Sequence, residues 1–277
     1  RAGENVLLRG RGDRRFERPN EARGAAGGRD WTTAFSAVWE GDAALPTLAF
    51  GNYLGLDDAG EATDTCADSR LFRPGQDDAA YGPPLALTPG LCTLSALFSD
   101  WDRTGRSDLR LTNDRHYYRD GGEQLWQMEP GQAPRLYGPD DGWAKMQIWG
   151  MGIASQDLTG DGRPEVYLTS QGDNKLQTLK EAATGPSYRD IALELGATAH
   201  RPFTGGDTLA STAWHPEFQD VNNDTFVDLF VSKGNVEKMT EFASRDPSNL
   251  LIGQPDGTFV ERAEEAGILS FERGRGA

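Results

Sequence analysis

Four segments of the chain repeat one pattern, and this repeat constrains the fold more than any other feature of the sequence. Each segment has an apolar stretch, then an acidic loop, then a second apolar stretch. The segments begin at Ala34, Ser95, Met151 and Ala213. The ninth positions of the four loops are Thr47, Asp108, Glu165 and Asp228. They recur at roughly 60 residues, a period that fits a β-propeller blade with loop insertions.

A second element recurs between these segments. It begins at Asn5, at Asn249 and, in a looser copy, at Asn174. In all three copies an aromatic residue lies eight residues before a glycine. The copy from Asn249 contains Asp256-Gly257, a dipeptide typical of a tight hairpin turn. We therefore expect an outer hairpin beside each pair of inner strands, which makes a four-stranded antiparallel blade.

The predicted fold is all-β. Residues 1–277 are expected to form a single-domain segment of a β-propeller, built from four-stranded antiparallel blades, of which about four are visible. The acidic, proline-rich stretch 54–92 is expected to be an insertion loop between blades. The last residues, 274–277, look like the beginning of another repeat. We therefore expect part of a larger propeller, with the remaining blades in a longer chain, because edge strands would otherwise be exposed.

The acidic loops follow the pattern D-x-D-x-D-G-x-x-D, with Asn or Thr allowed at the middle positions. Calcium takes about six to eight oxygen ligands at short range. A tight turn directs side chains one, three and five toward one point, and a glycine at position six permits the sharp bend. A backbone carbonyl at position seven and a carboxylate at position nine would complete the ligand set.

Three of the loops match this pattern and are predicted to bind calcium, which gives about three sites. The first loop offers Asp100, Asp102, Thr104, the carbonyl of Arg106, and Asp108. The second offers Asp157, Thr159, Asp161, the carbonyl of Arg163, and Glu165. The third offers Asp220, Asn222, Asp224, the carbonyl of Phe226, and Asp228. The plainer alternative is that all three are metal-free turns rich in Asp, Asn and Gly.

Two departures from the pattern stand out. The third loop has Thr225 in place of the glycine. In the earliest of the four segments, Trp39, Gly41 and Ala43 stand at the first three ligand positions, so we expect no metal there.

These motifs resemble the FG-GAP/VCBS repeats of integrin-α-like propellers. The outer hairpin GQPDGTFVERAEEAGI, followed by GRGA, is similar to bacterial relatives of cartilage acidic protein, which often carry a C-terminal ASPIC/UnbV module that this sequence lacks. The resemblance covers roughly residues 5–277 apart from the insertion. It implies calcium binding in the blade loops, export from the cytoplasm, and a role in binding proteins or glycans. The repeat is specific for the fold and poorly specific for function, because propellers serve many functions.

The net charge of −15 and the pI of about 4.6 narrow the classes of partner. Nucleic acid is not expected, because phosphate binding needs a basic surface. Clustered carboxylates suit a protein that holds divalent cations, although solubility alone also explains an acidic chain. No apolar run reaches the ~18 residues that a membrane-spanning helix needs.

The two cysteines, Cys66 and Cys92, both lie in the insertion. A disulfide between them would hold the insertion in place and would need an oxidising compartment, whereas two free thiols are the alternative. Without a C-x-x-C spacing, a zinc site is not expected. Arg1 is not a natural start, so we expect a processed or trimmed chain that is secreted, periplasmic or held at the cell surface.

The favoured function is a non-catalytic scaffold, and the alternative is a propeller enzyme, for example one with polysaccharide lyase-like activity. Loops on one face of a propeller can converge near its central channel. A site of that kind would use His116, Tyr117, His200, Arg201 and His215. Nothing in their spacing requires catalysis, and no serine elbow, H-E-x-x-H or phosphate loop is present.

The tryptophans leave a further choice open. They could line a sugar-binding face, or they could be core residues and wedges between blades. The five in question are Trp101, Trp126, Trp143, Trp149 and Trp214.

Overall fold

The computed structural model describes residues 5–18, 30–75, 80–114, 121–198, 208–235 and 241–276. These residues are almost entirely in strands, turns and loops, with one short 3-10 helix, η3 (Pro139–Asp141). The prediction of an all-β chain is confirmed. None of the helices in these residues is long and apolar enough to cross a membrane.

Sixteen of the strands form four antiparallel sheets of four strands each. The first sheet has the order β3 (Thr32–Val38), β4 (Thr47–Asn52), β7 (Ser69–Phe72), β8 (Leu85–Leu87). The second contains β9 (Thr93–Ser99), β10 (Asp108–Asn113), β11 (Gln124–Gln127) and β12 (Arg135–Leu136). The third contains β13 (Gly150–Gln156), β14 (Glu165–Ser170), β15 (Lys175–Leu179) and β16 (Tyr188–Asp190). The fourth contains β17 (Ala213–Gln219), β18 (Asp228–Lys233), β19 (Asn249–Gly253) and β20 (Phe259–Glu261).

The repeat in the sequence corresponds to these sheets. In each sheet the first two strands flank the loop of one repeat, and the third and fourth strands form an outer hairpin. The predicted outer hairpins from Asn174 and Asn249 are confirmed as β15–β16 and β19–β20. The hairpin from Asn5 forms a separate two-stranded sheet, β1 (Arg9–Gly12) with β2 (Arg15–Glu17).

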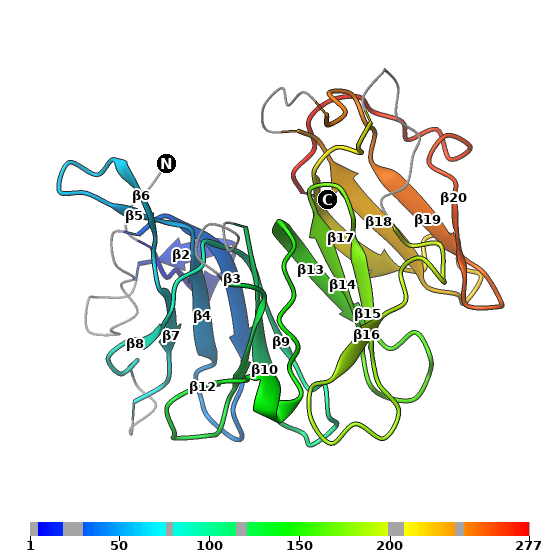
Figure 1. The fold of residues 1–277 in the computed structure, drawn as a ribbon. Coiled ribbons are helices and arrows are strands. Elements are labelled where there is room, and N and C mark those ends of the chain that lie inside the picture. The colour runs from blue at the N-terminus through cyan, green and yellow to red at the C-terminus, as the bar shows by residue number, and fades with distance from the viewer. Residues whose placement is uncertain are drawn as a thin grey trace.

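The four sheets follow one another along an arc, which can be traced from blue to red in Figure 1. Their first strands lie side by side in the order β3, β9, β13, β17. Apolar residues of the second strands fill the space between neighbouring sheets. Leu109 and Leu111 pack with Ala49 and Leu71 of the first sheet. Burial of a leucine side chain contributes about 1.5–3 kcal/mol to the stability of the fold.

The stretch 54–92, expected to be an insertion loop, contains four strands. Two of them, β7 and β8, are the outer strands of the first sheet, and β5 (Leu54–Leu56) pairs with β6 (Ala62–Cys66) in a separate hairpin. The expected disulfide is present and joins Cys66 at the end of β6 to Cys92 just before β9. The bond thus ties this stretch to the start of the second sheet.

Candidate metal loops

The three predicted calcium loops share one backbone conformation. In each loop, positions four and six have positive φ angles, which only a minority of residues adopt readily. The pairs are Arg103 (61°) and Gly105 (80°), Gly160 (74°) and Gly162 (82°), and Asn223 (59°) and Thr225 (76°). In the earliest loop only Gly41, at position three, has a positive φ (60°). The three matching loops are therefore one structural type, and the earliest loop is another.

The carboxylate at position one organises each of the three loops. Its oxygens accept a hydrogen bond from the backbone N–H of position six, at 2.9 Å for Asp100, 2.7 Å for Asp157 and 3.0 Å for Asp220. The same carboxylates also accept the N–H of position four or five. Such side-chain turns compete with regular secondary structure and explain why these residues form loops.

Positions three and five add further oxygen atoms to the loops. Asp102 and Asn222 each accept the N–H of position five, and Asp161 and Asp224 each accept the N–H of position seven. Thr159 lies exposed in the second loop. The structure therefore holds the side chains of positions one, three and five together in one tight turn.

The carboxylates at position nine lie instead inside the sheets. Asp108, Glu165 and Asp228 are at most 2% exposed. Glu165 accepts the N–H of Leu158 and the hydroxyl of Thr178, and Asp228 accepts the N–H of Val221 and of Gly253. Each therefore links its own loop to the third strand of its sheet.

Asp108 has a different set of donors. Its oxygens accept the N–H of Met128, the indole N–H of Trp101 and the hydroxyl of Tyr137. Burial, followed by the bond to Asp108, raises the pKa of Tyr137 above its usual range. The ninth residue thus braces the sheet in all three loops.

The donor set fits a hard cation in part. The exposed oxygens of positions one, three and five are of the type that calcium prefers. A carboxylate has about four lone pairs, so Glu165 and Asp228 retain acceptor capacity beyond two hydrogen bonds each. Among the described residues, however, no three Asp, Glu, His or Cys side chains already converge as a metal site would require.

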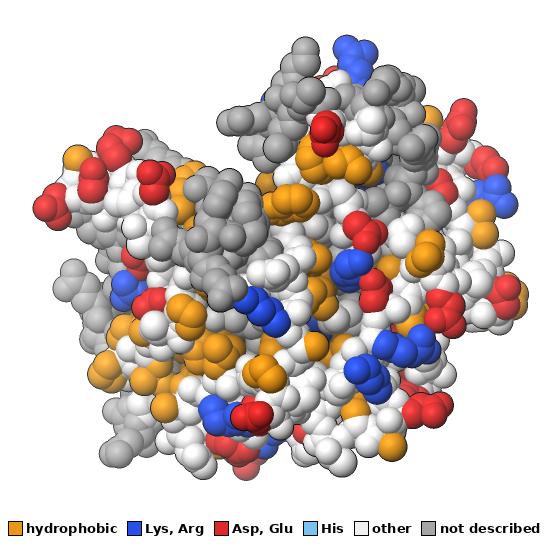
Figure 2. All heavy atoms as spheres, in the orientation of Figure 1, with side chains coloured by type: hydrophobic (Ala, Val, Ile, Leu, Met, Phe, Trp, Pro, Cys, Tyr) orange, Lys and Arg blue, Asp and Glu red, His pale blue; other side chains and the backbone are white. Residues whose placement is uncertain are grey.

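The second loop contacts a cation of the first loop on one side and borders a cavity on the other. The guanidinium of Arg103, in the first loop, donates a 2.6 Å hydrogen bond to the carbonyl of Asp161 and lies against Gly162 in the second. A cavity of about 370 Å³ separates the second loop, at Asp157, from the third, at Phe226. Figure 2 shows a further group of acidic side chains at the tip of the β5–β6 hairpin, away from these loops.

The candidate catalytic residues are not brought together in the described part of the chain. His116, Tyr117, His200 and Arg201 lie outside the described residues. The side chain of His215, on β17, is 43% exposed, and its Nε2 lies 3.5 Å from a carboxylate oxygen of Glu217.

Three of the five candidate tryptophans are buried, whereas Trp149 is 37% exposed. Trp101, Trp126 and Trp143 are at most 6% exposed and lie in hydrophobic clusters within and between the sheets. Trp214 donates to the carbonyl of Gly234. These positions favour the wedge interpretation over a sugar-binding face for the three buried rings.

Sequence reasoning missed the buried polar residues. The sequence signal at Arg110 is an alternation of apolar and polar residues, which is typical of a half-exposed strand. Instead, Arg110 is 2% exposed and lies over the rings of Trp143 and Tyr188, with centroid distances of 5.0 and 5.3 Å. The Lys233–Asp246 pair and Glu123 are buried in the same way.

Comparisons with known proteins identify no family. No protein-family model and no curated protein match the chain. Among solved structures, the GH43 protein BlXynB from Bacillus licheniformis is 12% identical with a TM-score of 0.42, and a mutant of it is 12% identical with a TM-score of 0.43. The matches cover 98% and 89% of this chain. The chain spans about half the length of those proteins, 52% and 46% respectively.

Thr225→Gly is expected to raise the free energy of unfolding by about 0.5–1 kcal/mol. The substitution relieves the strain of a β-branched residue in the left-handed region, and this gain exceeds the cost of the greater freedom that glycine gives the unfolded chain. Denaturant unfolding measures the change. Thr104→Gly is the matched control, since Thr104 occupies position five without a positive φ. There the substitution is expected to destabilise. Equal effects at the two positions would contradict the strain.

Proposed function

We propose that the chain is a segment of a β-propeller that binds calcium in three loops and serves as an exported, non-catalytic scaffold for a protein or glycan partner. The observation that carries the proposal is the shared conformation of the three loops, with left-handed residues at positions four and six and oxygen side chains at one, three and five. The earliest loop, which lacks those side chains, also lacks that conformation. Loss of the ligands and loss of the backbone geometry therefore occur together.

Each residue of a loop has its own part in binding. The carboxylate at position one, already aimed at the interior of the turn, would supply the main charge. Positions three and five and the carbonyl of position seven would supply further oxygens, and position nine would contribute its remaining acceptor capacity. Calcium bound there supplies positive charge that offsets the repulsion among the carboxylates.

The scaffold interpretation is supported by how the acidic residues are used. The ninth carboxylates brace the sheets through Leu158, Thr178 and Gly253, which is a structural function. The disulfide Cys66–Cys92 supports an oxidising compartment and so export. Of the five candidate catalytic residues only His215 lies within the described residues, where it is partly exposed beside Glu217.

The test is a thermal melt with calcium and with excess EGTA, joined to a calcium titration by calorimetry. Chelation is expected to lower the melting temperature by several degrees, reversibly with calcium and not with magnesium, because the ion binds the folded state. The titration is expected to give about three sites.

Variants assign the sites to loops. Asp220→Ala is expected to remove one site, because it deletes the carboxylate that organises the third loop. Asp42→Ala, in the earliest loop, is the matched control and is expected to leave the titration unchanged. A melt that does not respond to EGTA would leave the loops as metal-free turns and would end the proposal.

A further inference from the structure

The N-terminal hairpin has the register of an outer hairpin whose inner strands are elsewhere. Gly10 on β1 pairs with Phe16 on β2, just as Gly253 on β19 pairs with Phe259 on β20. In the described residues β1–β2 is a sheet of two strands, whereas β19–β20 is the outer half of a sheet of four. The N-terminal hairpin is thus half of the unit that the other sheets complete.

Counting back from the paired glycines places Leu8 and Leu7 at the positions of Leu251 and Leu250. In the fourth sheet these leucines are paired with β18 and are 0% and 8% exposed. Leu8 and Leu7 are 57% and 37% exposed. Apolar residues that are buried in one copy and exposed in the other indicate a missing neighbour.

The first sheet lacks the same neighbour on its outer face. On β3, Phe35 is paired with Phe50 and is 58% exposed. The residues at its position in the other three sheets are partly or fully buried. They are Ala96, Ile153 and Pro216, each identified by its pairing with the second strand.

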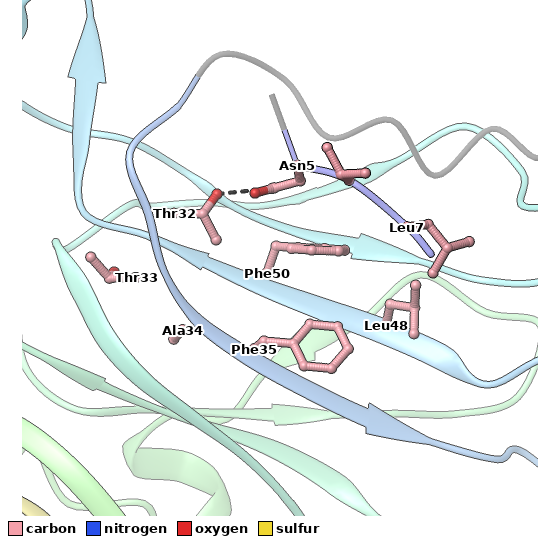
Figure 3. Close-up of a pocket in the computed structure, with 9 residues that line it drawn as sticks. Asn5, Leu7, Thr32, Thr33, Ala34, Phe35, Leu48 and Phe50 are labelled. Carbon is pink, nitrogen blue, oxygen red and sulfur yellow. Dashed lines mark hydrogen bonds between the residues drawn. The ribbon is translucent and has the colours of Figure 1, made fainter. Parts of the chain in front are cut away.

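A cavity of about 430 Å³ lies between these two surfaces. Figure 3 shows Leu7 of the N-terminal segment opposite Leu48, Phe35 and Phe50 of the first sheet. The side chain of Asn5 donates a 3.0 Å hydrogen bond to the hydroxyl of Thr32, and so holds the segment across the sheet. The rings of Phe35 and Phe50 are 5.3 Å apart and form the apolar floor.

We infer that this cavity is the docking site for a two-stranded β-hairpin, apolar on the side that faces Phe35, which pairs with the backbone of residues 6–8 and completes a four-stranded sheet. The occupant belongs to a partner segment of the same repeat type. Its strands supply main-chain hydrogen bonds along an edge to which the described residues contribute no paired strand, as in β-strand addition. The site goes beyond the proposed metal loops and does not depend on them.

The packing between neighbouring sheets shows what such a hairpin would supply. At the neighbouring interface, between the third and fourth sheets, Tyr167 of β14 packs against Phe218 of β17, with ring centroids 6.2 Å apart. Phe230 of β18 occupies the position of Tyr167, because both immediately follow the first apolar residue of a second strand. Ala37 of β3 occupies the position of Phe218, so a hairpin like β17–β18 would place an aromatic ring at Ala37, beside Leu48 of the cavity.

The probe is a fluorescently labelled peptide of residues 213–233, the hairpin that pairs with β19 in this chain. Saturable binding to the folded chain is expected by fluorescence anisotropy at fixed calcium. Leu7→Asp and Phe35→Asp are expected to weaken binding at least tenfold, because each places a charge in the apolar cavity. The peptide with Phe230→Asp is expected to bind as weakly.

The controls separate docking from other causes. Leu193→Asp changes an 85% exposed leucine elsewhere and is expected to keep full binding. Circular dichroism confirms that the variants fold, which is expected because Leu7 and Phe35 are already exposed. Absence of saturable binding, or equal binding by Leu7→Asp, would overturn the inference. If light scattering shows a dimer that Phe35→Asp abolishes, the docking inference is replaced by self-association of this chain. Because calcium is held constant in all of these measurements, their outcome does not test the metal loops.

Discussion

Asp246→Ala is expected to lower the free energy of unfolding by about 3–5 kcal/mol, because it removes the carboxylate that is paired with a buried ammonium. The Nζ of Lys233 lies 2.6 Å from an oxygen of Asp246, and the two side chains are 1% and 0% exposed. The same carboxylate oxygen accepts the N–H of Ser211 at 2.7 Å. Burial lowers the pKa of Lys233, and the charge of Asp246 opposes that shift. Denaturant unfolding at neutral pH measures the loss.

A second variant separates the charge from the packing. Lys233→Met combined with Asp246→Leu removes both charges, and it is expected to recover much of the lost stability because apolar residues of similar size often replace buried ion pairs without cost. Arg189→Ala, which breaks an exposed pair with Glu194, is the matched surface control, with an expected change of about 0–1 kcal/mol. If Asp246→Ala is as mild as Arg189→Ala, the pair is not buried in solution.

Glu123→Gln is expected to remove a strong dependence of stability on pH. Glu123 is 3% exposed, and burial, the largest cause, raises the pKa of its carboxyl from 4.5 to about 8. One oxygen accepts the N–H of Asn113 at 3.2 Å, and the other, which has the hydroxyl of Thr112 as its neighbour, accepts no hydrogen bond of normal geometry within the described residues. Hydrogen bonds from neighbouring groups and the charge of Arg110 oppose the shift without cancelling it.

The sign of the effect follows from proton binding. Between pH 4.5 and about 8 the folded protein holds a proton on Glu123 that the unfolded chain has lost. Stability therefore falls as pH rises through this window, by up to about 1.4 kcal/mol per pH unit, and the fall ends above the folded pKa. Glutamine keeps an acceptor for Asn113 and carries no charge, so Glu123→Gln is expected to be more stable than the parent, most of all near pH 9.

Unfolding curves of parent and variant between pH 5 and 9 measure this difference. Glu194 is the matched control, because its side chain is 64% exposed and Glu194→Gln is expected to change stability little across the range. A parallel pH dependence of parent and Glu123→Gln would contradict the assignment.

The sequence predicted the strand pairs because their signals are local. Apolar stretches on either side of an acidic loop, and an Asp-Gly turn within a hairpin, depend on neighbouring residues. The sequence did not locate the outer hairpin of the second sheet, because this hairpin begins with Gln124 and not with an asparagine. Gln124 pairs with Leu111 of the second strand, as Asn249 pairs with Val231 in the fourth sheet. Pairing with the second strand, and not the residue type, defines that position.

The burial of polar side chains between the sheets could not be predicted from neighbouring residues in the sequence. Arg110 follows Leu109 in an alternating strand, and alternation is typical of one buried and one solvated face. In this fold a sheet is covered on both faces, so the polar position is buried as well. The inward direction of Asp108, Glu165 and Asp228 was missed for a related reason, since the donors that hold them come from distant strands.

The bond between Cys66 and Cys92 closes a covalent ring of chain that contains both outer strands of the first sheet. Any single cut of the backbone between the two cysteines leaves the fragments joined, so they separate on a gel only after reduction. The ring also restricts the unfolded chain, since β7 and β8 stay tethered beside β9 after they leave the sheet. A protease that nicks this part of the molecule would open a strand edge without releasing a fragment.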